Sequence, residues 1–192
     1  EDLLTELDQR EIPWVILGGG SNVLVSDDPW DAVVIRLESA CSQIRVLDVS
    51  MERGVQKVSV FVGAGVSLSA FIRFCVRERL GGAEFLVGIP GSMGGALFMN
   101  AGTSGGAVSD ILQWVEVLSP QGTKDRLTKN GLACGYRSMG IPMGRVLSGA
   151  CLILESREES LIRENLRRLV VRRNSTQPVG TASAGCIFKN PA

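Results

Sequence analysis

The spacing of apolar residues along the chain predicts a mixture of helices and strands. Helical periodicity is found in residues 1–10, 67–82 and 158–174. A serine can cap the start of the second helix, and a pair of glycines ends it. The third helix is predicted to bury one apolar side, formed by Leu161, Ile162, Leu166, Leu169 and Val170.

Strands are predicted where apolar residues run together or alternate with polar ones before a turn residue. Such runs occur in residues 14–22, 32–37, 57–65, 111–128 and 145–156. The fourth run is predicted to form two strands around a Pro-Gln-Gly turn. The fifth is either a strand pair or one long strand. The chain is therefore expected to be a mixed α and β protein.

Composition and charge narrow the functional classes. The 192 residues carry 20 basic and 20 acidic side chains, so no net field attracts nucleic acid or an anionic membrane. No aromatic stripe alternates with Lys or Arg, which also argues against nucleic-acid binding. The uncharged run 85–109 is long enough to cross a bilayer, but Pro90, Asn100 and seven glycines argue against membrane insertion.

Cysteine and histidine usage limits the chemistry that the chain can perform. The five cysteines are widely spaced without a CxxC pair, which favours a reducing cytoplasm and argues against a metal site. The absence of histidine excludes Ser-His and Cys-His nucleophile pairs and imidazole ligands. Acid–base chemistry therefore rests on Cys, Tyr, Lys, Asp or Glu, or on a bound cofactor.

Glycine clusters are the most informative local feature. The stretch GIPGSMGGALFMNAG, residues 88–102, is one-third glycine and has no charge. The cluster GGGSN, residues 18–22, follows a predicted strand and offers consecutive N–H groups to a phosphate, although such a cluster alone is more often a tight turn. It matches neither GxGxxG nor a P-loop. Several such turns together indicate a long ligand such as a dinucleotide, whose pyrophosphate needs donors without side-chain bulk.

Four motifs occur in a fixed order: LGGGSNVLV at 17–25, GAEFLVGIPGSMGGALFMNAGTSGG at 82–106, CGYRS at 134–138 and SAGCIFKNP at 183–191. Together they make the chain resemble the FAD-binding portion of the UDP-N-acetylenolpyruvoylglucosamine reductase (MurB) family. The wider flavin superfamily, which includes vanillyl-alcohol-oxidase-like proteins, shares the first two motifs. The last two are specific to the reductases.

The resemblance implies an α+β fold in which two lobes hold FAD. Residues 1–40 would be the C-terminal part of a small N-terminal lobe, and residues 41–178 the larger FAD-binding lobe. Residues 179–192 would begin a truncated substrate-binding domain. The chain is accordingly expected to be a segment of a longer protein whose substrate domain is largely absent here.

The same resemblance implies FAD as cofactor, NADPH as hydride donor and a UDP-sugar enolpyruvyl substrate. The enzyme would be a cytoplasmic bacterial reductase of peptidoglycan precursor synthesis. By position in the motifs, the residues expected to contact FAD are Gly18, Gly20, Ser21, Asn22, Gly91, Ser92, Gly94, Gly95, Asn100, Ala101 and Gly102.

Two residues are expected to act in catalysis. Arg137 matches the family arginine that stabilises charge on the substrate carboxylate, a role suited to its two-pronged guanidinium. Cys186 stands where the family most often has the serine that protonates the substrate carbon. Met139 replaces a second serine that the family often has, and the family's catalytic glutamate has no counterpart. We interpret Glu155, Glu158 and Glu159 as charges at a helix start that complement the helix dipole, and we assign none of them a catalytic role.

Two other interpretations stay open. One is a different flavin oxidoreductase of the same superfamily, although no histidine is present to carry a covalent flavin. The other is a non-catalytic module that only binds FAD or a nucleotide.

Overall fold

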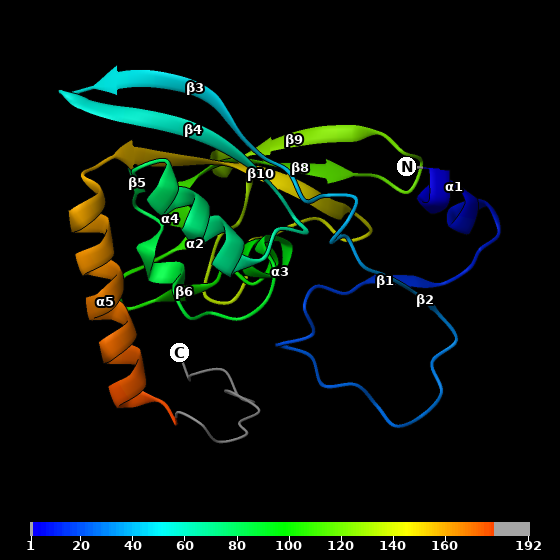
Figure 1. Cartoon of the computed structure of the whole chain (residues 1–192). Coiled ribbons are helices and arrows are strands. Elements are labelled where there is room, and N and C mark those ends of the chain that lie inside the picture. The colour runs from blue at the N-terminus through cyan, green and yellow to red at the C-terminus, as the bar shows by residue number, and fades with distance from the viewer. Residues whose placement is uncertain (1, 179–192) are drawn as a thin grey trace.

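The computed structural model describes residues 2–178, in which helices pack against one face of an antiparallel sheet (Figure 1). The helices are α1 (Asp2–Gln9), α2 (Leu68–Arg77), α3 (Met93–Phe98), α4 (Val108–Ile111), α5 (Glu159–Thr176) and the 3-10 turns η1 (Glu84–Leu86) and η2 (Lys129–Gly131). The strands are β1 (Trp14–Ile16), β2 (Val33–Ile35), β3 (Ile44–Glu52), β4 (Val55–Gly63), β5 (Leu80–Gly81), β6 (Gly102–Thr103), β7 (Gly106–Ala107), β8 (Leu112–Leu118), β9 (Lys124–Thr128) and β10 (Val146–Ser156).

The main sheet has the strand order β3-β4-β10-β8-β9, and the short β5 pairs with the end of β10. Every pairing in it is antiparallel. The central β10 is buried along most of its length, as expected for a strand with neighbours on both edges. Figure 1 shows α2, α3 and α5 on the same side of this sheet.

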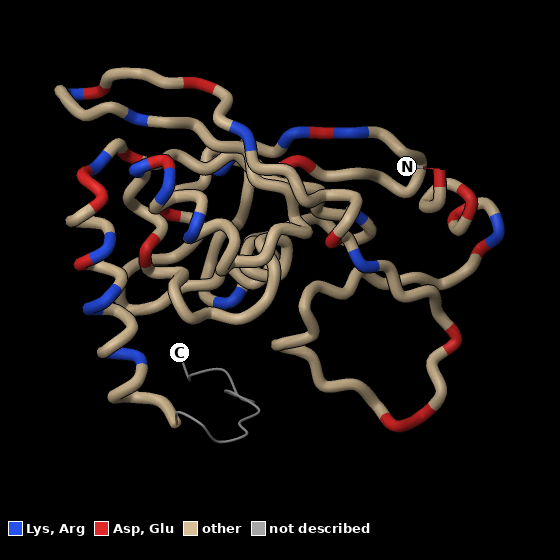
Figure 2. The backbone as a smooth tube through the Cα atoms, in the orientation of Figure 1, with Lys and Arg blue, Asp and Glu red and all other residues tan. Residues whose placement is uncertain are grey.

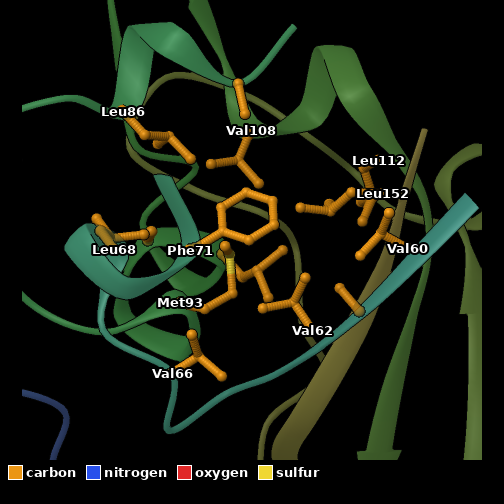
Figure 3. Close-up of a cluster of buried hydrophobic side chains, with 14 of the residues drawn as sticks. Val60, Val62, Val66, Leu68, Phe71, Leu86, Met93, Val108, Leu112 and Leu152 are labelled. Atoms are coloured by element: carbon orange, nitrogen blue, oxygen red, sulfur yellow. The ribbon is translucent and has the colours of Figure 1, made fainter. Parts of the chain in front are cut away.

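The hydrophobic core lies between the sheet and these helices, with Phe71 near its centre (Figure 3). Phe71 is fully buried on α2, whose start is capped by the Ser67 hydroxyl accepting from the Ala70 N–H at 3.2 Å. Val60 and Val62 of β4 reach the same cluster because alternate residues of a strand share a face. Residues of β4, α2 and α3 all contribute to this core, which therefore fixes the segment that runs from β4 through α3.

The first strands form a separate small unit beside the sheet. β1 and β2 pair in parallel, and their apolar side chains pack with Leu4, Leu118 and Val146 in a second buried cluster. The loop of residues 17–32 that joins β1 to β2 extends away from the sheet in Figure 1. The lobe boundaries near residues 40 and 178 stay a prediction.

Most of the predicted elements are confirmed. The three predicted helices are α1, α2 and α5, and residues 145–156 form one long strand rather than a pair. On α5, however, Ile162 is buried whereas Leu161 and Val170 are exposed, so the apolar side is narrower than predicted. Within residues 2–178, no helix is both long and apolar enough to cross a membrane.

Three other expectations need correction. The strand β3 was not predicted, because its exposed residues do not alternate clearly. The glycine-rich residues 88–102 contain the helix α3, although only turns and ligand contacts were predicted there. Glu155 lies in β10 rather than at a helix start, and its carboxylate pairs with Lys57 at 2.7 Å. That hydrogen bond, together with one from Arg157, lowers the pKa of Glu155.

Candidate cofactor site

A cavity of about 650 Å³ lies where the small N-terminal unit meets the helical layer. Its walls come from β1 and the loop after it, the turn after β4, the segment leading into α3, and the loop before β10. The volume falls within the range of about 300–1,000 Å³ that is usual for cofactor and ligand sites. The N-terminal residues therefore complete a site that the main sheet alone does not enclose.

One wall of the cavity is the backbone of residues 18–22. Their N–H groups make no hydrogen bond to any other residue within 2–178, and all five residues line the cavity. The loop between β1 and β2 carries aspartates but no Lys or Arg, as Figure 2 shows. An anion bound at this wall would consequently be held by backbone N–H groups, as in the phosphate-binding nests of other proteins.

The two glycine clusters pack directly against each other. A Cβ on Gly19 would lie 3.1 Å from the Gly91 Cα, and a Cβ on Gly91 would lie 2.8 Å from the Ser21 Oγ. The Ser21 hydroxyl donates to the Pro90 carbonyl at 3.2 Å. Gly91 also has a φ of 108°, which favours glycine. These contacts bring residues 18–22 and 90–92, distant in sequence, into one wall.

The start of α3 is bonded to the core rather than free for a ligand. Its Met93 and Gly94 N–H groups donate to the carbonyls of Val66 and Ala64 at 2.7 and 2.8 Å. A Cβ on Gly94 would lie 2.9 Å from the Ala64 Cβ, whereas one on Gly95 would meet only the Ser92 Oγ, at 3.8 Å. Gly94 is therefore required by packing against Ala64 in the turn after β4, and Gly95 is the position where a side chain would reach open space.

Arg137 reaches the cavity from a tight turn. Gly135 and Ser138 exchange two backbone hydrogen bonds, of 2.8 and 3.2 Å, which leave Tyr136 and Arg137 at the tip. Arg137 has a φ of 58°, a left-handed conformation that is uncommon for a side chain of its size. Its guanidinium carbon lies 5.5 Å from the centroid of the Tyr136 ring, a cation–π distance. Strain of this kind is frequent at functional sites.

Asn100 supports this turn from the end of α3. Its Nδ2 donates to the Gly135 carbonyl at 3.0 Å, and its Oδ1 accepts from the Ser109 N–H at 3.0 Å. Asn100 has a φ of 42° and follows the helix end, where asparagine is tolerated in that conformation. Its side chain is thus engaged within the protein and does not line the cavity.

The structure gathers most of the predicted site residues around one cavity. Those that line it are Gly18, Gly20, Ser21, Asn22, Gly91, Ser92, Gly94, Gly95, Ala101 and Arg137. Asn100 and Gly102 do not line it; a Cβ on Gly102 would lie 2.8 Å from the Gly106 carbonyl oxygen, so β6–β7 packing explains that glycine. Cys186 lies outside the described residues.

Sequence analysis did not identify several other residues that line the cavity. Trp14, Leu37 and Leu147 provide apolar surface there, and Arg145 lines it while paired with Asp125 at 2.6 Å. Their local patterns are those of ordinary strand residues. Only the pairing of distant strands distinguishes the cavity wall from the core at these positions.

The comparison with protein families defines the class. The family described as FAD binding domain matches residues 1–128, so the chain belongs to the FAD-binding domain family. A cholesterol oxidase structure shares the fold, with a TM-score of 0.58 at 13% identity over 80% of this chain and 32% of that one. The expected α+β fold of this flavin superfamily is confirmed.

Within that class, the chain corresponds to the FAD-binding portion of proteins named UDP-N-acetylenolpyruvoylglucosamine reductase. The protein of that name from Syntrophobacter fumaroxidans is 45% identical over 98% of this chain and 54% of its own length. The one from Geobacter sulfurreducens is 36% identical over 98% of this chain and 60% of its own length. The crystal structure of MurB from Thermus caldophilus matches with a TM-score of 0.77 at 33% identity, over 97% of this chain and 65% of that one. The chain thus spans only about half to two-thirds of these relatives.

Proposed function

We propose that this chain is the FAD-binding part of a cytoplasmic reductase that uses NADPH to convert UDP-N-acetylglucosamine enolpyruvate into UDP-N-acetylmuramate. This reaction serves peptidoglycan precursor synthesis. We propose no nucleic-acid partner. The names of the relatives support the enolpyruvyl substrate. The family resemblance carried by the four motifs supports NADPH as the hydride donor. The observation that carries the proposal is a wall formed by residues 18–22, whose backbone N–H groups bond no other residue within 2–178, in the same cavity as Arg137.

The residues present fit an FAD. Residues 18–22 supply donors for a pyrophosphate without side-chain bulk in the way. Gly95 leaves one wall open, because outside the backbone of α3 itself the Ser92 hydroxyl is the one group of residues 2–178 found within 4 Å of the position of a Cβ. Trp14, Leu37 and Leu147 provide apolar surface for a flat ring.

FAD held by residues 18–22 and 90–92 would supply hydride transfer between NADPH and the enolpyruvyl double bond of the substrate. Arg137 is proposed to bind the substrate carboxylate and to stabilise the negative charge that develops there. An arginine side chain carries its positive charge without help from a neighbouring group, so it can pair with a carboxylate directly. The strained turn would fix its direction before substrate arrives.

Cys186 is proposed to donate a proton to the substrate carbon left after hydride transfer. A thiol with an ordinary pKa of about 8.5 is mostly protonated at neutral pH and is a stronger acid than a hydroxyl. In the complete enzyme, Cys186→Ser should keep substantial turnover and Cys186→Ala should lose most of it, with flavin reduction by NADPH nearly unchanged in both. Substrate-driven reoxidation of reduced flavin at the wild-type rate in Cys186→Ala would return this residue to a packing role.

The proposal is tested by loading the purified chain with FAD. A flavin absorption spectrum that NADPH bleaches and the enolpyruvyl substrate restores supports the full reaction. Bleaching without restoration supports a competent flavin-binding part that needs the rest of the enzyme for its substrate. A chain that retains no flavin overturns the proposal.

A further inference from the structure

Arg173, in the last turn of α5, is a half-buried arginine with no carboxylate partner in the part of the chain that the structure describes. Other arginines of this chain pair readily: Arg163 with Glu159 at 2.7 Å, and Arg145 with Asp125 at 2.6 Å. Among residues 2–178, no acidic side chain lies within ion-pair distance of Arg173. A half-buried arginine can pack its aliphatic stem against the protein while its charged head stays in water, so the contacts of that stem define its packing role.

Arg173 packs against the backbone of Gly88. A Cβ on Gly88 would lie 2.8 Å from the Arg173 Cδ and 3.1 Å from its Nε. Gly88 has a φ of 74° and begins the stretch that runs into α3. The arginine side chain therefore occupies the space that any other residue at position 88 would need.

The turn that Arg173 covers leads directly into the wall of the cavity. Ile89, Pro90 and Gly91 line the cavity, and the Gly91 carbonyl accepts from the Leu68 N–H at 3.0 Å. The Ile89 N–H donates to the Leu86 carbonyl at 3.1 Å. These two hydrogen bonds hold residues 86–91 at either end. The Arg173 side chain packs against Gly88, which lies between them.

We propose that Arg173 is a positioning residue for the cofactor site: it packs on Gly88 and holds residues 89–91 in the conformation that lines the cavity. The proposal rests on the proposed function only in taking FAD as the ligand. A basic residue near a helix end also complements the helix dipole; Arg172 lies one residue earlier on α5 and is exposed. Arg172 is therefore the matched control.

The first experiment measures FAD affinity by quenching of flavin fluorescence. If Arg173→Ala leaves residues 89–91 correctly placed for one-tenth of the time, the apparent Kd rises about tenfold, whereas Arg172→Ala changes it less than about twofold. Arg173→Met keeps the aliphatic stem that touches Gly88 and should retain most of the affinity. Loss of affinity in Arg173→Met but not in Arg173→Lys would assign a role to the charge and overturn the packing proposal. Equal affinities in wild type and Arg173→Ala would overturn it as well.

The second experiment needs no cofactor, so it separates this inference from the proposed function. In the FAD-free chain, Arg173→Ala should speed hydrogen exchange at the Ile89 amide, and Arg172→Ala should not. In a double-mutant cycle, Gly88→Ala should destabilise the wild type more than it destabilises Arg173→Ala, where only the strain of the positive φ remains. Unchanged exchange at Ile89, or an equal effect of Gly88→Ala in both backgrounds, would overturn the proposal even if FAD binds normally.

Discussion

The side-chain amide of Asn100 donates a 3.0 Å hydrogen bond to the carbonyl of Gly135, and so ties the end of α3 to the turn that carries Arg137. The other end of the same amide accepts from the Ser109 N–H at the start of α4. One side chain therefore joins three segments. Gly135 and Ser138 close the turn that carries Arg137. By holding Gly135, the Asn100 amide helps to set the direction in which Arg137 points.

Asn100→Asp should loosen this turn, because it removes the donor to Gly135 while keeping an acceptor for Ser109. The expected loss is about 1 kcal/mol of unfolding free energy, the net value of a typical hydrogen bond. Urea unfolding measures that loss, and faster hydrogen exchange at the Ser138 amide would locate it. Asn100→Gly is the control for backbone strain, since glycine accepts the φ of 42° without cost. Unchanged exchange at Ser138 in Asn100→Asp would show that the turn closes without Asn100.

Substitution of the neighbouring Gly94 and Gly95 should separate folding from cofactor binding. Gly94→Ala places a Cβ 2.9 Å from that of Ala64 and should destabilise the fold by about 1–3 kcal/mol, as overpacked cores do. Gly95→Val should leave the fold intact and weaken FAD binding, because its side chain enters open space beside the cavity. Urea midpoints and FAD titrations of both variants test this. Retention of stoichiometric FAD by Gly95→Val would remove Gly95 from the cofactor site.

The sequence predicts the elements better than it predicts the roles of single residues. Ser67 and the spacing around Phe71 suffice to predict α2 because local capping and burial agree there. α3 escapes prediction because its Gly94 is explained by a contact with Ala64, which is distant in sequence. Asn100 shows the same limit. Its motif predicts a flavin contact, which stays a prediction. The structure adds hydrogen bonds from both ends of its amide to Gly135 and Ser109, and no local pattern reveals those partners.

Two buried thiols should make the stability fall at alkaline pH. Burial raises the pKa of Cys75 to about 12, with the Glu84 carboxylate adding to the effect, and burial raises that of Cys151 to about 11. In the unfolded chain both thiols have pKa values near 8.5, so below that pH both states hold the protons and the stabilisation is complete. Above it only the unfolded state loses protons, and each thiol lowers the unfolding free energy by about 1.4 kcal/mol per pH unit.

Urea unfolding at pH 8, 9 and 10 measures this decline. Cys75→Ala should be less stable than wild type at pH 8 but should lose stability more slowly as the pH rises. The variant also controls for the other groups that titrate in this range. An identical pH slope in wild type and Cys75→Ala would show that the Cys75 thiolate forms in the folded protein as easily as in the unfolded chain.

Arg137→Gly should make the chain more stable and the enzyme less active. The left-handed conformation at a φ of 58° costs a non-glycine residue about 1 kcal/mol, and glycine avoids that cost. Removal of the guanidinium is expected to slow the substrate half-reaction by about 3 kcal/mol in barrier, as loss of other preorganised charge stabilisers does. Arg137→Ala is the matched control, because it loses the same guanidinium but keeps the strain. Both variants should be reduced by NADPH at the wild-type rate in the complete enzyme, and only Arg137→Gly should show a raised urea midpoint. Slower flavin reduction in both variants, in step with slower reoxidation, would assign Arg137 to cofactor placement rather than to the substrate carboxylate.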